Sequence, residues 1–247
     1  MAVLGASLIA AEVSTSWLQS RLASRIGREL TWSLEAGASP QIAFPKHGPY
    51  DARLGYTRLA RETRRLTARG FEISAQARMS PSLVALERLG ISPPHPEKAA
   101  AGLTLLDRSR ERLFEARYPR FTWDRFARIP RVIVETVLFI ENRELLGARS
   151  PYANPAVEWD RLLRVLTWSA LPIEGRTPGA STLATQLEKY RHSPGGRTAS
   201  ASEKLRQMAA ATLRAYHGGP DTREERQRIV LDYVNTVFAW LWPDFPR

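Results

Sequence analysis

Two short stretches of the sequence carry residue types suited to acid–base chemistry and to anion binding. The first contains Glu141, which follows Val134, Val137 and Leu138 at the spacing of one helix face. A carboxyl group in apolar surroundings is suited to proton transfer. The second, residues 179–189, begins with glycine and hydroxyl side chains and ends in lysine. Because a helix N-terminus with such groups binds anions, the two stretches together predict group transfer from a phosphorylated donor.

The second stretch is expected to form a capped helix. It should begin at Ser181 or Thr182, since either hydroxyl is a good N-cap after the break at Pro178–Gly179. Thr182, Gln186 and Lys189 then share one face, and this polar stripe ends in a cation. An ordinary capped amphipathic helix would show the same pattern, so the stretch alone does not establish an anion site.

Glu141 also has a structural interpretation, an ion pair with an arginine such as Arg143 or Arg164. Both interpretations remain open at this point. Further along the chain, two helices are predicted to begin with capping boxes, Ser200 with Glu203 and Thr222 with Glu225.

Composition limits the class of protein. The chain has 247 residues, of which 43% are hydrophobic, enough for a folded core. Its net charge of +11, with 32 Arg and 4 Lys, favours a polyanionic partner: nucleic acid, anionic lipid headgroups or a pyrophosphate. The absence of Cys excludes disulfides and thiolate sites, and the four His residues show no metal-ligand spacing. We interpret His192, beside Ser193 and Pro194, as a loop residue.

The organisation predicted along the chain is a small α+β region followed by a helical lobe. We place the first at residues 1–119 and the second at residues 120–247. Within the first region, we expect a helix over 14–38, a basic helix over 56–69, and strands over 71–77 and 103–106. Residues 2–11 are apolar but too few to span a bilayer. They are either the trailing end of a membrane anchor or a helix packed on the domain.

The order of motifs in the helical part resembles the family 51 glycosyltransferases, the peptidoglycan transglycosylases that polymerise lipid II. Several motifs in the same order are far more specific than any one of them. The matching segments are Ile129–Pro130 with Glu141–Asn142, Gly179 through Lys189, Glu203–Lys204 with Gln207, and Ile229 through Asn235. The resemblance implies a mainly α, lysozyme-like helical lobe, divergent from the family and cut short at its C-terminus.

The resemblance also implies a mechanism. Glu141 occupies the position of the base that deprotonates the acceptor hydroxyl of lipid II, which then attacks the lipid-linked glycan strand with inversion. The positions that hold substrate phosphates and sugars are Ser181, Thr182, Gln186, Lys189, Lys204 and Gln207. A divalent cation, Mg or Mn, often assists at the pyrophosphate in the family, but this sequence has no metal signature. The implied location is the outer or periplasmic face of a bacterial cytoplasmic membrane, with an anionic membrane surface as partner.

Departures from the family pattern leave an alternative function open. Asn142 replaces an Asp, Leu145 replaces a Phe, and Gln207 replaces the second catalytic Glu. The alternative is a catalytically weak or inactive membrane-associated module that binds lipid-linked glycan precursors. A third interpretation, nucleic-acid binding through the basic helix over 56–69, lacks any supporting motif, and we expect no nucleic-acid partner.

Overall fold

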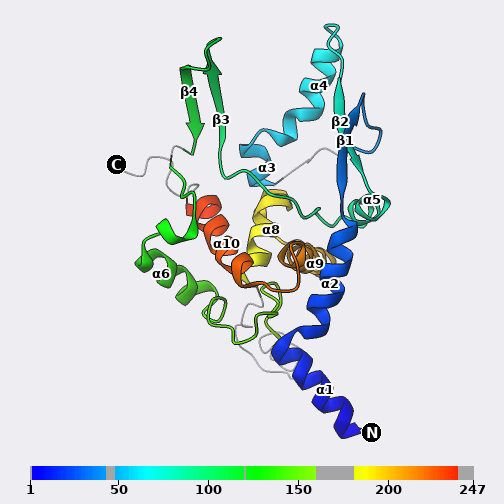
Figure 1. The fold of residues 1–247 in the computed structure, drawn as a ribbon, viewed down its shortest axis with the longest axis vertical. Coiled ribbons are helices and arrows are strands. Elements are labelled where there is room, and N and C mark those ends of the chain that lie inside the picture. The colour runs from blue at the N-terminus through cyan, green and yellow to red at the C-terminus, as the bar shows by residue number, and fades with distance from the viewer. Residues whose placement is uncertain (1, 43–47, 120, 160–180, 239–247) are drawn as a thin grey trace.

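The computed structural model describes residues 2–42, 48–119, 121–159 and 181–238 (Figure 1). Helices predominate, and the two sheets of the described residues are small antiparallel pairs of two strands. The predicted mainly α class is therefore confirmed.

The chain begins with two helices, α1 (Ala2–Thr15) and α2 (Trp17–Glu29), separated at Ser16 by a left-handed backbone conformation with φ of 56°. The helix predicted over 14–38 is confirmed at Trp17–Glu29, but its predicted extent beyond these residues was wrong. After α2, residues Trp32–Ala36 form strand β1, which pairs with β2 (Ala75–Met79). The alternation of Trp32, Leu34 and Ala36 has the two-residue period of a strand, which the longer helical pattern before it obscured.

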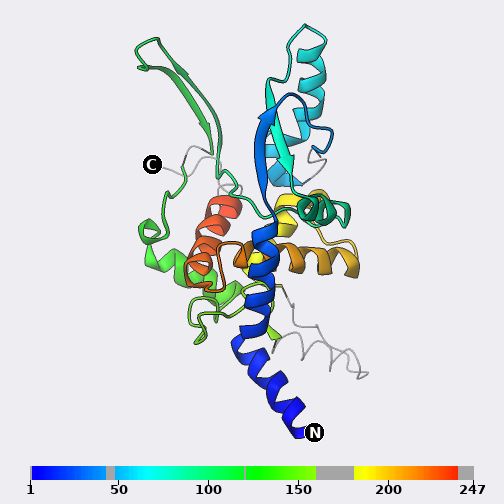
Figure 2. The same ribbon diagram turned by 45° about the vertical axis from the view of Figure 1, so that its right-hand side comes forward.

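The rest of the first region forms two arms. One arm contains the β1–β2 pair and α4 (Leu59–Thr67), and the other is the hairpin of β3 (Ala101–Leu106) and β4 (Arg112–Tyr118). Both project at the end of the molecule opposite α1 (Figures 1 and 2). The remaining short elements are α3 (Pro49–Arg53), η1 (Tyr56–Arg58) and α5 (Pro81–Arg88). The strand predicted at 103–106 is confirmed, whereas that predicted at 71–77 begins only at Ala75.

The main core lies between helices of the second region. These are α6 (Arg131–Glu141), α8 (Leu183–His192), α9 (Ala201–Tyr216) and α10 (Arg223–Tyr233), with a π-helical segment at Val234–Phe238. Two 3-10 turns, η2 (Phe126–Arg128) and η3 (Pro194–Gly196), precede α6 and follow α8. The core is apolar, and its buried members include Val134, Val137, Leu145, Leu183, Leu187, Ile229 and Val230. This packing fixes the end of α6 against α8 and α10.

Helix α2 packs on α9 through its smallest side chains. Its buried residues are Ser20, Ala23, Ser24 and Gly27. A Cβ at Gly27 would lie 3.1 Å from the Cα of His217, so glycine permits this close approach. The apolar residues of α2, in contrast, face outward, with Leu18 and Leu22 60% and 59% exposed. Among the described residues, no helix has both the length and the apolar character needed to cross a bilayer.

Candidate functional site

Glu141 is the last residue of α6 and is partly buried, as its place on the apolar face predicted. Two neutral side chains donate hydrogen bonds to its carboxylate: the amide of Gln186 from α8, and the hydroxyl of Tyr233 from α10. Burial, the adjacent carboxylate and this hydrogen bond raise the pKa of Tyr233 to about 12, so its hydroxyl keeps its proton near neutral pH.

Of the two arginines considered as partners for Glu141, the structure describes only Arg143. Arg143 donates to the backbone carbonyl of Phe139 and stacks on that ring, 3.9 Å from its centroid. Arg164 lies outside the described residues, as do Gly179 and Ala180 at the start of the second motif.

Thr182 is the N-cap of α8, which confirms the predicted start of this helix. Its hydroxyl accepts from the N–H of Thr185, and the Thr185 hydroxyl accepts from the N–H of Thr182. Both side chains are buried. Thr182 therefore serves the helix itself, and a ligand reaching α8 would meet Ser181, Gln186 and Lys189, which are all partly exposed.

Two lysines lie near one another, Lys189 in the last turn of α8 and Lys204 on α9. Lys204 from α9 donates to the hydroxyl of Ser181 at 2.8 Å. Burial and the nearby charge of Lys189 lower the pKa of Lys204. Among the described residues, neither ammonium group pairs with a carboxylate. Two neighbouring positive charges, one of them bonded to Ser181 at the start of α8, favour an anion at this position.

Gln207 contacts the connection between α8 and α9. Its side chain is buried, its nitrogen donates to the Ser193 hydroxyl at 2.9 Å, and its oxygen accepts from the Thr198 hydroxyl at 3.0 Å. It therefore joins α9 to the connection that follows α8. It also lines a groove of about 370 Å³, together with His192 and Arg206. The contacts of Gln207 are with this connection rather than with Ser181 or the carboxylate of Glu141.

Residues of α10 stabilise the segment that follows Glu141. The buried guanidinium of Arg226 donates to the backbone carbonyls of Ala148 and Ser150. The hydroxyl of Thr222 donates to Pro151 and Ala153 in the same segment. The predicted capping box of Thr222 is therefore wrong, because its hydroxyl is used by this segment. The predicted cap at Ser200 is confirmed, since its oxygen accepts from the N–H of Glu203 at 3.1 Å.

Asn235, in the fourth motif, has a structural contact that sequence patterns did not indicate. Its side-chain oxygen accepts from the backbone N–H of Trp123, and its nitrogen donates to the Trp123 carbonyl, both at 2.9 Å. The residue is buried in the π-helical segment after α10. This two-point contact fixes the chain entering α6 against the chain leaving α10.

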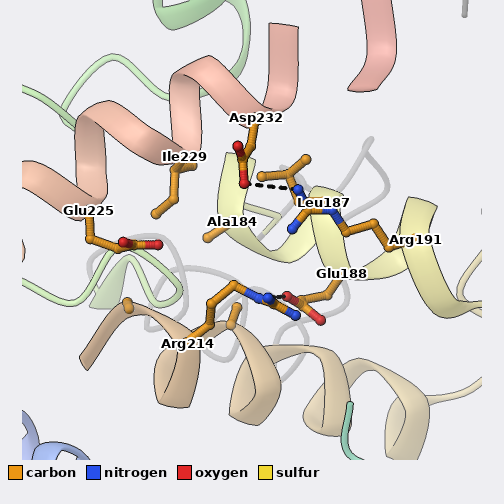
Figure 3. Close-up of a pocket in the computed structure, with 10 residues that line it drawn as sticks. Ala184, Leu187, Glu188, Arg191, Arg214, Glu225, Ile229 and Asp232 are labelled. Atoms are coloured by element: carbon orange, nitrogen blue, oxygen red, sulfur yellow. Dashed lines mark hydrogen bonds and ion pairs between the residues drawn. The ribbon is translucent and has the colours of Figure 1, made fainter. Parts of the chain in front are cut away.

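The C-terminal end of α8 lies in a cluster of buried ion pairs. Arg191 reaches Asp232 of α10 at 2.9 Å, and Arg214 of α9 reaches Glu188 at 2.6 Å (Figure 3). Glu97, whose side chain is 1% exposed, lies 3.1 Å from Arg214. A small cavity of about 10 Å³ beside these residues leaves room for no more than a single water.

His192 belongs to this cluster, so its interpretation as a loop residue was wrong. It is the last residue of α8, with its ring nitrogens 3.3 Å from Asp51 and 3.2 Å from Glu97. Burial alone would lower the pKa of His192, but hydrogen bonds to these carboxylates outweigh it and raise the pKa to about 9. Burial alone would raise the pKa of Glu97, but Arg191, His192 and Arg214 hold it well below its ordinary value. The sequence signal for this cluster was weak, because its partners lie far apart along the chain.

The described residues do not fit a metal bound by protein ligands. Among them, no group of three or more His, Asp or Glu side chains could hold a metal ion. At the third motif, Gln207 offers an amide that is already occupied by two hydroxyls.

Comparison with known proteins agrees with the motifs. A family model described as Transglycosylase matches residues 110–239, more than half of the chain. Neither a curated protein nor a solved structure matches the chain. The matched range contains Glu141, the N-terminal half of α8 and the lysine pair. The chain therefore belongs to the transglycosylase family, and its function is of the peptidoglycan glycosyltransferase type.

Proposed function

We propose that this protein is a peptidoglycan glycosyltransferase that polymerises lipid II into glycan strands, with Glu141 as the general base. The observation that carries the proposal is one face of α8. Gln186 on this helix binds the Glu141 carboxylate, while Ser181 at its start binds Lys204, and Lys189 adds a second cation. The proposed base on α6 and the proposed anion site thus both contact α8.

In the proposed reaction, the acceptor hydroxyl of lipid II loses its proton to Glu141 as its oxygen attacks C1 of the donor sugar. The bond between C1 and the pyrophosphate oxygen breaks, and the configuration at C1 inverts. The charge that develops on the leaving pyrophosphate would be stabilised by Lys204, Lys189 and the N-terminus of α8. Gln186 and Tyr233 donate to Glu141 and orient its carboxylate.

The test is glycan formation from lipid II in detergent micelles. The wild-type protein should produce glycan strands, and Glu141→Gln should not, because the amide accepts no proton. The matched control is Glu135→Gln, an exposed position on the same helix. The proposal fails if the wild type makes no glycan, or if Glu141→Gln makes as much as the control.

A second candidate function is an inactive or weakly active module that binds lipid-linked glycan precursors. The observation favouring it is Gln207, whose amide cannot replace the second carboxylate of the family and is occupied by Ser193 and Thr198. This candidate predicts that lipid II binds to the wild type and to Glu141→Gln equally, without turnover by either.

We further propose an anionic membrane surface as the partner, at the outer face of a bacterial cytoplasmic membrane. Support comes from α2, whose Leu18, Leu22 and Ile26 form an exposed stripe beside exposed arginines. An apolar stripe next to cations suits the interface of an anionic bilayer. Replacing Leu18 and Leu22 by Ser should reduce sedimentation with anionic vesicles, and replacing Leu205, an exposed leucine on α9, should not. Equal sedimentation of both variants would overturn this proposal.

A further inference from the structure

Asn142, the residue after Glu141, connects three segments around the site. Its side chain is 2% exposed, and its backbone N–H donates to Leu138 at the end of α6. Its side-chain oxygen accepts from the backbone N–H of Leu183, the first residue of α8, at 3.4 Å. Its side-chain nitrogen donates to the carboxylate of Glu158. One amide group therefore joins α6, α8 and the segment before residue 160.

An amide suits this position because it donates and accepts at once. The N–H of Leu183 is one of the first N–H groups of a helix, which have no acceptor within the helix. An aspartate at position 142 could accept from it, but would place a second carboxylate against Glu158. Two adjacent carboxylates repel, so one of them would take up a proton or move away. A buried apolar side chain would leave the N–H unsatisfied.

The contacts of Asn142 run beside the contact between Glu141 and Gln186. Both sets begin at the C-terminal end of α6 and reach the first turns of α8. Adjacent connections of this kind limit how far the Glu141 carboxylate can shift relative to Ser181. A carboxylate that must accept a proton at one position gains most from such a restriction.

We propose that Asn142 and Glu158 form a positioning pair that keeps Glu141 in place for proton transfer, an inference that rests on the proposed base function of Glu141. The pair also accounts for the amide at position 142, where the family pattern has an Asp. In this chain the negative charge next to that position comes from Glu158. The test of this proposal exchanges the amide at position 142 and the carboxylate at position 158.

The experiment compares the wild type with Asn142→Asp, Glu158→Gln and the double variant, using glycan formation from lipid II. Asn142→Asp should lower kcat by about a hundredfold with KM nearly unchanged, since a base displaced by about 1 Å costs that much. Glu158→Gln should have a small effect, because the new amide still accepts from Asn142. In the double variant, the amide introduced at position 158 can donate to the carboxylate introduced at position 142. The kcat of the double variant should therefore return to within about fivefold of the wild type.

Thermal unfolding of the same four proteins separates misfolding from mispositioning. The proposal is overturned if Asn142→Asp is as active as the wild type. It is also overturned if the double variant unfolds like the wild type but is no more active than Asn142→Asp. If the wild type itself makes no glycan, the proposed function fails, and the positioning proposal fails with it. An active wild type with insensitive variants refutes the positioning pair alone.

Discussion

Two faces of helix α8 use charge in opposite ways. On the buried face, Glu188, Arg191 and His192 meet partners of opposite charge from α3, α9, α10 and the segment around Glu97. On the partly exposed face, Lys189 lies close enough to Lys204 for their charges to interact, and no described carboxylate pairs with either. The first face has charges matched within the fold, whereas the second presents charge without a matching carboxylate among the described residues.

This contrast separates structural charges from functional ones within one helix. Buried charges that are matched by partners hold distant segments together, and removing one partner is costly. Like charges left unmatched beside one another cost stability, which a bound anion would offset. Substitutions on the buried face should therefore change stability most, and substitutions at the lysine pair should change binding of an anion most.

The largest effect on stability is expected from Glu97→Ala. Glu97 is buried among Arg191, His192 and Arg214, and its removal leaves these cations without their shared partner. The free energy of unfolding in urea should fall by about 3–5 kcal/mol. The control is Glu135→Ala, whose ion pair with Arg131 is exposed and should contribute no more than about 1 kcal/mol. A similar, small loss in both variants would refute the structural assignment of the cluster.

The titration of His192 should change the free energy of unfolding by a smaller amount, at most about 3 kcal/mol. Because its pKa is raised to about 9, its contribution to stability is complete below its unfolded pKa, about 6.5, and is lost as pH rises through 9. The wild type should therefore exceed His192→Gln in unfolding free energy at pH 6, and the difference should shrink towards pH 10. Burial raises the pKa of Glu225 to about 7, but that titration occurs in both proteins. A constant difference across this range would contradict the prediction.

At the lysine pair, Lys204→Gln should weaken binding of an isoprenyl pyrophosphate by about 10- to 100-fold, the effect of losing one charged hydrogen-bond donor. Since burial and Lys189 lower the pKa of Lys204, the wild-type affinity should also fall as pH rises, at a pH below that expected for an ordinary lysine. Isothermal titration calorimetry measures both effects. Lys98→Gln provides the control, because Lys98 lies outside this pair. An equal loss of affinity in Lys204→Gln and Lys98→Gln would refute the proposed anion site.

The smallest effect on activity is expected from Gln207→Glu. The position is buried and the substitution replaces a neutral amide by a carboxylate, so the free energy of unfolding should fall by about 1–3 kcal/mol, even though the hydroxyls of Ser193 and Thr198 can donate to the new group. Glycan formation should stay within about twofold of the wild type, since the side chain contacts the connection after α8. The exposed Gln227→Glu serves as control for the added charge. A large gain in activity would show that position 207 acts at the reacting groups.

Local patterns in the sequence predicted one end of α8 better than the other. The placement of Glu141, the cap at Thr182 and the cap at Ser200 follow from helical spacing and hydroxyl positions, and the structure confirms them. The C-terminal cluster was missed because Asp51 and Glu97 come from a region with no helical periodicity linking them to α8.

Competing contacts explain the local predictions that failed. Thr222 looked like a cap but donates to carbonyls of the segment at 151–153, a tertiary contact that sequence spacing does not reveal. The helix predicted over 14–38 extended the helical pattern of α2 too far, back across Ser16 and forward into strand β1. Tyr233 and Asn142 reach Glu141 or its neighbours only once α6, α8 and α10 are packed together.

The central claim, that Glu141 takes the acceptor proton beside an anion site on α8, is tested most directly by Glu141→Gln in a paired measurement of turnover and affinity. We predict that the polymerisation rate at saturating lipid II falls by about 10²- to 10⁴-fold, while lipid II still binds with nearly the wild-type Kd. An unchanged rate would contradict the account, and so would a loss of binding as large as the loss of rate.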